Sequence, residues 1–346
     1  MRDFFENLKN GLSCRIDWLS FTIFDDSVEA ALDNFGFDIG DFYSCPKGAN
    51  GYKSMLMLNG SSLRVLYDGA EGMGIHFDVS GSAMVDLFQF FSGLFSEPTP
   101  FGGDAIDWDC QIMTKLLERV ELLGHVTRLD LAIDNADNIY FTCDDIVDVM
   151  RNQCFISKFR SWRNLAEYAT SGKVKGHTVY LGNRTSDVML RIYDKQAEQG
   201  TDFPWVRWEL ELKGQRAIDS IRLMVSGMSV GQVCLGILSN YYRIIQLDDL
   251  NKSRCTLDPL YSRFLDGVQA LRLFVPCDEK TLEQKRDWIV KQVMPTMTAL
   301  ILADDGDVSF LTNEIDVHAG RMSRHLQQMV SAKNPNWRAE LDMLTH

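Results

Sequence analysis

The sequence predicts an α+β protein: an antiparallel sheet with helices packed on one face, followed by an all-helical C-terminal region. Several segments alternate between polar and apolar residues, as half-buried strands do. Turn signals such as Asn59-Gly60 and Asp68-Gly69 join neighbouring strands closely enough for antiparallel pairing. Amphipathic helices lie between the strands, and beyond Lys213 helical spacing takes over.

The elements follow one another in an order that favours this architecture. The expected strands cover residues 14–24, 52–58, 62–67, 73–80, 126–134, 177–184, 189–195 and 205–213. The expected helices cover residues 26–35, 82–95, 107–123, 143–152, 215–225, 230–238, 257–271, 281–302 and 317–333, and residues 98–104 form a Pro- and Gly-rich loop. Strands joined by turns, with helices between the groups, pack best as an antiparallel sheet that is covered on one face.

The chain is long for one compact domain, because single cores stop growing beyond about 250–300 residues. Its 346 residues include an Asp-Asp-Leu-Asn-Lys-Ser stretch at 248–253 that is typical of a linker. We therefore expect an α+β domain over residues 1–250 and a helical domain over residues 251–346.

Composition excludes several classes of function. A net charge of −13 argues against a general nucleic-acid binder, because phosphate affinity comes mainly from Lys and Arg. The longest apolar runs fall far short of the roughly 20 residues that cross a bilayer, so we expect no contact with membranes. The first residues lack the apolar run of a secretory signal, which places the protein in the cytoplasm. No phosphate-cradling G-x-x-x-x-G-K loop and no H-x-H pair occurs in the sequence.

Three of the expected strands carry charged residues on one face and apolar residues on the other. The polar positions are Arg128, Asp130 and Asp134 in residues 126–134, Arg191, Tyr193 and Lys195 in residues 189–195, and Arg207, Glu209, Glu211 and Lys213 in residues 205–213. If these strands lie side by side, three or four carboxylates converge near a tyrosine that is flanked by cations. Such a composition indicates a metal-assisted site that acts on a phosphate.

The chemistry of phosphodiester cleavage assigns roles to these residues. Asp130, Glu209 and Glu211 offer the hard oxygen ligands that suit Mg²⁺ or Mn²⁺, which would neutralise charge on the phosphate. Tyr193 would be the nucleophile, activated by the metal or by Lys195. The alternative is that these residues only decorate the solvent face of a sheet with cross-strand ion pairs. From the pattern alone, this alternative is favoured.

Two further features admit more than one interpretation. Residues 158–172 interleave aromatic residues with cations, including Arg160 and Arg163. Such a segment suits single-stranded nucleic acid, where rings stack on bases, and equally suits an ordinary amphipathic segment. Asp17 is the one polar residue on its face of the first strand. It either supports a neighbouring ligand or simply ends the strand, and we favour the second interpretation.

Four motifs in order resemble the replication initiation factor family, which includes rolling-circle plasmid initiators and nicking relaxases of integrative conjugative elements. They are Arg128-Leu-Asp-Leu-Ala-Ile-Asp134, Tyr180-Leu-Gly182, Arg191-Ile-Tyr-Asp-Lys195 and Arg207-Trp-Glu-Leu-Glu211. The resemblance covers roughly residues 16–216, and its most specific piece is the R-I-Y-D-K strand. The strongly acidic composition departs from what an origin-binding protein requires.

The resemblance implies site-specific nicking of one DNA strand at an origin, with Tyr193 joined to the 5′ phosphate and a free 3′ hydroxyl left for replication or conjugative transfer. It implies that Asp130, Glu209 and Glu211 hold the ion and that Arg128, Arg191 and Lys195 steady the phosphate. We also expect Arg207, Arg160 and Arg163 to contact DNA. The expected partners are origin DNA with a single-stranded or cruciform nick site, a host helicase and a second copy of the chain.

Three other functions compete with this interpretation. One is a hydrolytic metal-dependent nuclease in which Tyr193 only positions DNA. Another is a non-catalytic, sequence-specific DNA-binding protein. A tyrosine recombinase is weaker, because its tyrosine lies on a late helix whereas Tyr193 is expected on a strand.

Overall fold

The computed structural model describes residues 12–95, 105–172, 174–269, 274–276, 289–309 and 324–339, with a few isolated positions between 282 and 322. Its backbone forms two compact units, one made of Met1–Asp38 and Phe42–Cys277 and the other of Ile39–Asp41 and Asp278–His346. The expected loop at residues 98–104 lies outside the described residues.

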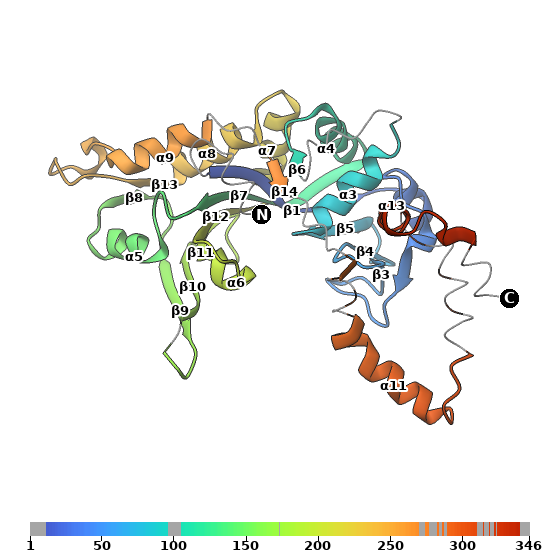
Figure 1. Ribbon diagram of the computed structural model, residues 1–346. Coiled ribbons are helices and arrows are strands. Elements are labelled where there is room, and N and C mark those ends of the chain that lie inside the picture. The colour runs from blue at the N-terminus through green and yellow to red at the C-terminus, as the bar shows by residue number, and fades with distance from the viewer. Residues whose placement is uncertain are drawn as a thin grey trace. The chain divides into compact units, whose positions relative to one another are not determined.

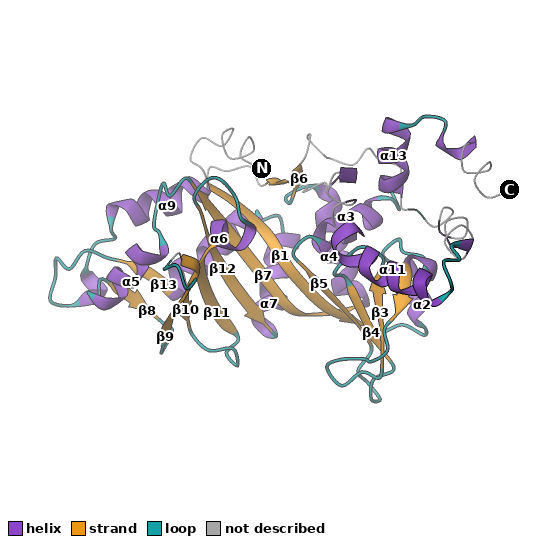
Figure 2. Ribbon diagram, turned by 60° about the horizontal axis from the view of Figure 1, so that its bottom comes forward, coloured by secondary structure: helices purple, strands orange, loops and turns teal. Residues whose placement is uncertain are grey.

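Ten strands of the larger unit form one sheet in which every neighbouring pair is antiparallel. Their order is β2-β3-β4-β5-β1-β7-β12-β11-β10-β9. In chain order the strands are β1 (Leu12–Ile23), β2 (Phe42–Ser44), β3 (Ser54–Leu58), β4 (Arg64–Tyr67), β5 (Ile75–Ser80), β7 (Gly124–Ala136), β9 (Trp162–Tyr168), β10 (Val174–Leu181), β11 (Val188–Asp194) and β12 (Trp205–Lys213). Figure 2 shows the long strands β1, β7 and β12 side by side at the centre. Two small ribbons pair β13 (Tyr242–Ile244) with β8 (Phe155–Ser157) and β14 (Phe274–Pro276) with β6 (Ala105–Asp107).

Helices cover one face of this sheet, except for the short α6 (Lys195–Gln199), which lies on the opposite face (Figure 1 and Figure 2). Those of the larger unit are α2 (Val28–Asp33), α3 (Ala83–Ser92), α4 (Gln111–Leu123), α5 (Cys143–Arg151), α6 (Lys195–Gln199), α7 (Gln215–Val225), α8 (Val230–Tyr241) and α9 (Pro259–Gln269), with a 3₁₀ turn η2 (Lys252–Arg254). Capping boxes begin two of them, at Thr142 before α5 and at Ser229 before α8, which fixes where the chain leaves a turn and enters a helix. The predicted fold class is confirmed for this unit.

The core forms between the sheet and these helices because the strands alternate. In the row of residues paired across β7, β12, β11 and β10, the side chains of Ile133, Trp208, Ile192 and Val179 are all buried in one apolar cluster. Apolar helix residues complete the same cluster. The intervening residues of each strand therefore point to the opposite face, which we call the open face.

A β-bulge interrupts the alternation of β1. The pairing of β1 with β7 shifts between Ile16 and Trp18, so that Asp17 is the extra residue. Because the bulge resets the alternation by one residue, Arg15, Asp17 and Trp18 all contribute side chains to the polar network of the open face. Alternation alone could not predict this arrangement, and the favoured interpretation of Asp17 as a mere strand-end residue is wrong.

Residues just beyond the predicted domain boundary at 250, including α9, belong to the larger compact unit. The division into domains 1–250 and 251–346 stays a prediction. The described elements of the second unit are helical: η1 (Ile39–Asp41), the π-helical turn η3 (Ile289–Val293), α11 (Met294–Ala303) and α13 (Arg324–Lys333). Among the described helices, none is long and apolar enough to cross a bilayer.

Candidate active site

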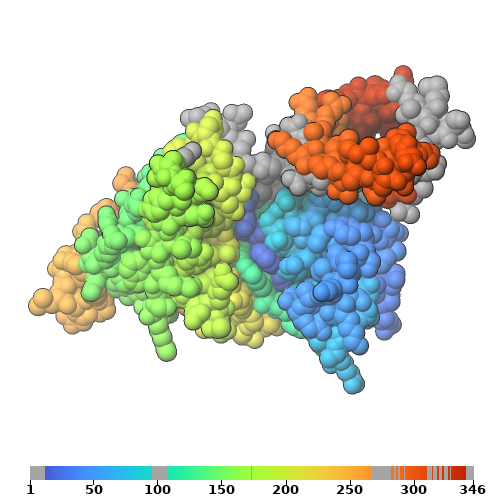
Figure 3. Space-filling model, turned by 90° about the horizontal axis from the view of Figure 1, so that it is seen from below, coloured from blue at the N-terminus to red at the C-terminus, as the bar shows by residue number. Residues whose placement is uncertain are grey.

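The registers of β7, β12 and β11 bring the predicted polar residues together. Glu211 of β12 lies opposite Asp130 of β7, and Glu209 lies opposite Arg191 of β11. Paired residues of an antiparallel ladder point to the same face. Seen from below, the open face is hollowed between the green part of the chain, with β9 to β11, and the blue part, with β3 to β5 (Figure 3).

We call Asp130, Glu209 and Glu211 the carboxylate cluster. Asp130 has no exposed surface, and the two glutamates are almost as buried. Arg128 holds Asp130 with two parallel hydrogen bonds, from Nε to Oδ1 at 2.9 Å and from Nη2 to Oδ2 at 2.7 Å, and reaches Glu211 Oε2 at 3.1 Å. Buried carboxylates are costly unless they are paired in this way.

Arg191 occupies the space between the three carboxylates. Its Nη2 donates to Asp130 Oδ2 at 3.1 Å, bonds Glu209, and lies 3.9 Å from Glu211 Oε2. Among the described residues, no three His, Cys, Asp or Glu side chains are arranged like the ligands of a metal ion. The donors are nevertheless the oxygen ligands that Mg²⁺ and Mn²⁺ take. The cluster therefore fits such an ion by its chemistry, with the guanidinium of Arg191 as the cation that neutralises it here.

Burial sets the protonation of Asp130. The pKa of Asp130 is raised to about 8: removal from water raises it most, the hydrogen bonds from Arg128 oppose the rise, and the charge of Glu209 adds to it. A carboxyl group with such a pKa exchanges its proton near neutral pH. The cluster can therefore accept an additional cation by releasing a proton.

Tyr193 lies at the edge of the carboxylate cluster. Its hydroxyl donates to Glu209 Oε2 at 2.9 Å, so the phenol and a carboxylate that could take its proton are within hydrogen-bond distance. Burial raises the pKa of the phenol above its usual range, and although Arg207 opposes this, the charge of Glu209 adds to it. The phenol is thus neutral at physiological pH, and Glu209 is the carboxylate placed to accept its proton.

The sequence pattern predicted that Lys195 continues the strand, and this prediction is wrong. β11 ends at Asp194, whose side chain accepts from the backbone N–H of Ala197 and caps α6, and Lys195 is the first residue of that helix. The Lys195 ammonium bonds Glu198 Oε2 at 2.7 Å and lies 5.5 Å from the centre of the Tyr193 ring. Burial, followed by the charge of Arg207, lowers the pKa of Lys195. The ammonium therefore lies against the ring of Tyr193, with Glu198 as its hydrogen-bond partner.

Arg207, which we expected to contact DNA, is wholly buried beside Tyr193. It lies opposite Tyr193 on one side and Asp134 on the other. Its Nε and Nη2 bind the two oxygens of Asp134 at 2.6 and 3.0 Å, and its Nη1 binds Asp17 at 2.7 Å. Direct contact with DNA would require these ion pairs to open. Asp134 thus belongs to this second cluster and not to the carboxylate cluster.

The second cluster is a network of mutually neutralising charges. Although burial by itself raises the pKa of Asp17, the charges of Arg207 and Arg15 outweigh it and hold that pKa below its usual range. Burial likewise disfavours the charged form of Arg207, and Asp134 and Asp17 reverse this, so that its pKa is raised well above normal. Arg207 is therefore permanently charged and is fixed by its ion pairs at the position opposite Tyr193.

The other two arginines expected at DNA lie farther along the sheet. Arg163 of β9 is exposed and stands opposite Tyr180 of β10, which in turn stands opposite Arg191. Arg163 therefore shares the open face with the carboxylate cluster, three strands from Glu209. Arg160 is exposed in the segment before β9, away from the cluster.

The polar network contains residues that the sequence pattern did not single out. Trp18 lies opposite Asp130 in β1, and the guanidinium of Arg128 lies 3.9 Å from the centre of its indole ring. Lys213 Nζ lies 2.6 Å from Glu211 Oε1, which gives that carboxylate a third cation besides Arg128 and Arg191. Lys213 was on the expected polar face, whereas Trp18 depends on the bulge and had no signal in the sequence.

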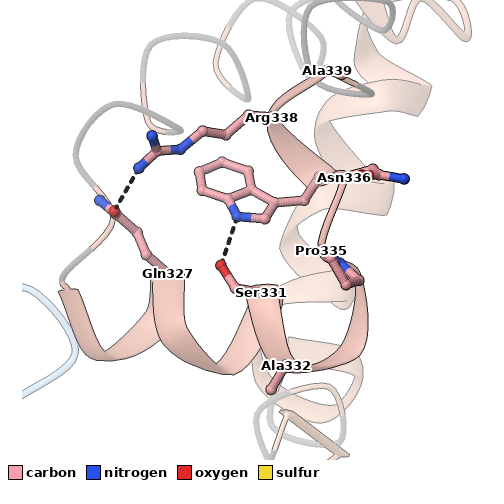
Figure 4. Close-up of a pocket in the computed structure, with 8 residues that line it drawn as sticks. Gln327, Ser331, Ala332, Pro335, Asn336, Arg338 and Ala339 are labelled. Atoms are coloured by element: carbon pink, nitrogen blue, oxygen red, sulfur yellow. Dashed lines mark hydrogen bonds between the residues drawn. The ribbon is translucent and has the colours of Figure 1, made fainter.

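A hollow in the second unit is unrelated to this chemistry. It lies at the C-terminal end of α13, where Trp337 Nε1 donates to Ser331 Oγ at 3.0 Å and Arg338 reaches Gln327 (Figure 4). Its lining contains no carboxylate, histidine or cysteine.

Comparison with known proteins agrees with this arrangement. Residues 124–315, more than half of the chain, match the family model described as replication initiation factor. The chain belongs to the replication initiation factor family. The resemblance predicted from the four motifs is thereby confirmed, and the matched region contains every residue of the carboxylate cluster together with Tyr193.

Two relatives represent the family. The protein named "Putative DNA relaxase NicK" of Bacillus subtilis (strain 168) is 28% identical over 192 residues, which cover 53% of this chain and 54% of that protein. The chain therefore matches about half the length of that relative. The solved structure of the rolling circle replication initiator protein from Geobacillus stearothermophilus is 28% identical with a TM-score of 0.63, covering 76% of this chain and 98% of the other.

Loss of the buried cation should destabilise the fold. Replacing Arg207 with Met leaves Asp134 and Asp17 without their main partner, so we expect the free energy of unfolding in urea to fall by about 3–5 kcal/mol. Arg222→Met is the matched control, because Arg222 pairs with Glu121 at the surface and its side chain is 62% exposed. Its loss should cost less than about 1 kcal/mol. Equal losses in the two variants would contradict the structural role of Arg207.

Proposed function

We propose that this protein nicks one strand of DNA at a specific site by attack of Tyr193 on a phosphodiester, which leaves a 5′-phosphotyrosine and a free 3′ hydroxyl. The observation that carries the proposal is the hydrogen bond from the Tyr193 hydroxyl to Glu209, on the open face of a sheet and beside two further carboxylates. Membership of the replication initiation factor family supports an origin as the target.

The side chains suggest how the reaction proceeds. Glu209 takes the phenolic proton as the Tyr193 oxygen forms a bond to phosphorus, and the bond between phosphorus and the 3′ oxygen breaks. The leaving 3′ oxygen takes a proton from water and becomes the free hydroxyl. Arg128 and Arg191, half-exposed beside the cluster, supply positive charge for the phosphate oxygens. Lys195 lies against the ring of Tyr193, and the buried Arg207 is the neighbour of Tyr193 across the strands.

We further propose that Asp130, Glu209 and Glu211 hold Mg²⁺ or Mn²⁺ when DNA is processed. The ion supplies charge that neutralises the phosphate oxygens and lowers the barrier to attack. Three carboxylates from two adjacent strands, one of them with a pKa near neutrality, support this assignment. Arg191 would then be free to turn towards the phosphate.

The proposal extends to partners. An initiator or relaxase acts on origin DNA whose nick site is single-stranded or extruded as a cruciform. Nicking does not unwind a duplex, so a host helicase is the partner that would follow. A homodimer is the proposed assembly, and sedimentation of the purified chain tests it. Replication and conjugative transfer share the same first step.

Removal of the phenolic oxygen should abolish covalent attachment. With Mn²⁺ and supercoiled DNA that carries the protein's own locus, we expect the native chain to give a nicked circle with protein attached. Tyr193→Phe should give none while it still binds the DNA, because only the hydroxyl is lost. Tyr43→Phe is the control, since Tyr43 is exposed on the edge strand β2.

Two outcomes of that assay would favour other functions. An undiminished adduct with Tyr193→Phe would remove this residue from the reaction. Free 5′ phosphate ends without protein would indicate a hydrolytic nuclease that uses the same carboxylates. Sequence-specific binding without cleavage by any divalent ion would indicate a non-catalytic DNA-binding protein.

Loss of the base or of the metal should stop the reaction by different routes. We expect a chelator to abolish adduct formation and added Mn²⁺ to restore it. Glu209→Gln should slow adduct formation by a factor of about 10² or more in saturating Mn²⁺, because a general base contributes roughly that much. Glu118→Gln, at an exposed position of α4, should react at the native rate. Full activity in chelator would contradict the metal assignment.

A further inference from the structure

Trp18 stands out on the open face as a large aromatic residue among charged ones. It is half-buried and lies outside the apolar cluster that the sheet forms with its helices. The indole is nevertheless fixed in place, because its Nε1 donates to Ser20 Oγ at 2.7 Å and to Asp78 Oδ1 at 2.8 Å. Asp78 is buried and is held in turn by Arg64.

Trp18 is connected directly to the carboxylate cluster. It stands opposite Asp130 in the ladder, and Arg128 joins the two by binding Asp130 with one edge and stacking on the indole with its plane. The β-bulge at Asp17 is what turns the indole to this face. A rigid, oriented aromatic group beside a reactive centre is what base stacking requires.

A similar pair lies on the other side of the cluster. The guanidinium of Arg163 lies 5.4 Å from the centre of the Tyr180 ring, and Tyr180 stands opposite Arg191. In the strand order β10-β11-β12-β7-β1, four inter-strand spacings separate Tyr180 from Trp18. That is about 19 Å, or roughly five to six nucleotides at the rise of a stacked strand.

We propose that unpaired DNA crosses the open face over Tyr193, with one base stacked on the Trp18–Arg128 pair and another on the Tyr180–Arg163 pair. Rings and guanidinium planes both stack on bases, and neither reads the sequence. The ligand of these two pairs is therefore single-stranded DNA, bound on both sides of the scissile phosphate. This inference rests on the proposed function, and it adds the path of the strand and the two aromatic contacts.

Charge accounts for how a protein of net charge −13 can hold this strand. Along the path the exposed or half-exposed cations are Arg163, Arg191 and Arg128, whereas the acidic groups beside them are buried and paired with arginines. The phosphates of the strand therefore meet cations and the bases meet flat side chains. A duplex offers its bases only at their edges, so the two pairs favour unpaired DNA.

Fluorescence of a modified base tests the path directly. The probe is an oligothymidylate that carries 2-aminopurine at some positions, whose emission is quenched when it stacks on an aromatic ring. We expect the native chain, without added metal, to bind the probe and quench it. Trp18→Leu should weaken binding about tenfold and lose much of the quenching, as expected when one base loses its stacking partner. Tyr180→Leu should have the same effect.

Two matched variants separate stacking from a structural role. Trp18→Phe keeps a ring but cannot donate to Asp78, so it should retain most of the affinity and the quenching. Phe24→Leu removes an exposed aromatic side chain beyond the end of β1 and should leave both unchanged. The dissociation constant for a duplex of oligothymidylate and oligoadenylate, measured by competition with the probe, should be the same for the native chain and Trp18→Leu.

The results distinguish this inference from the nicking proposal. One outcome is that the native chain forms the covalent adduct, but Trp18→Leu and Tyr180→Leu bind and quench the probe as strongly as the native chain. The strand then does not follow this path, and the inference is overturned. If Trp18→Leu weakens duplex and single-stranded binding equally, the indole has only a structural role, which also overturns it. If the native chain neither forms an adduct nor binds single-stranded DNA, the proposed function fails as well.

Discussion

The arrangement of the site depends on one constraint: most helices of the larger unit pack on one face of the sheet, so most alternate residues of its central strands are polar. On β7, β12 and β11 these residues are mostly charged, and the carboxylates among them are nonetheless buried, because neighbouring side chains shield them. A buried charge is tolerated only when an opposite charge neutralises it. The arginines on neighbouring positions meet that requirement, and their positions determine where the carboxylates lie.

Two clusters of this kind adjoin Tyr193, and they differ in how completely their charges are paired and buried. Around Arg207, every charge is paired internally with Asp134 or Asp17, and the guanidinium has no exposed surface. Around Asp130, the arginines remain half-exposed and the carboxylates include one that can lose a proton near neutral pH. The first cluster therefore has a structural role. The second cluster has arginines and carboxylates that are available to a substrate.

Alternation in the sequence was sufficient to place much of the site. It put Asp130, Glu209, Glu211 and Tyr193 on one face, because period-two alternation survives in strands that are regular throughout. Alternation could not predict the register between the strands. That register determines that the Tyr193 hydroxyl bonds Glu209 and not Glu211.

The failures have equally specific causes. A bulge reset the alternation in β1 and brought Asp17 and Trp18 into the site. The Asp194 cap ended β11 one residue early, so Lys195 began a helix. Arg207 looked like Arg191 in the sequence, yet one is buried and the other half-exposed, because Asp134 and Asp17 enclose only the first. Burial depends on neighbours from distant segments, and a single strand pattern does not contain them.

The central claim is that the polar network prepares Tyr193 as the nucleophile. The most direct test of this claim is to identify the peptide that becomes linked to DNA. The covalent adduct formed with Mn²⁺ would be digested with nuclease and then with trypsin, which cuts after Arg191 and Lys195, and the products would be analysed by mass spectrometry. We expect the residual nucleotide on the peptide of residues 192–195, attached to Tyr193. A nucleotide on a peptide with a different tyrosine, such as Tyr180, would contradict the account.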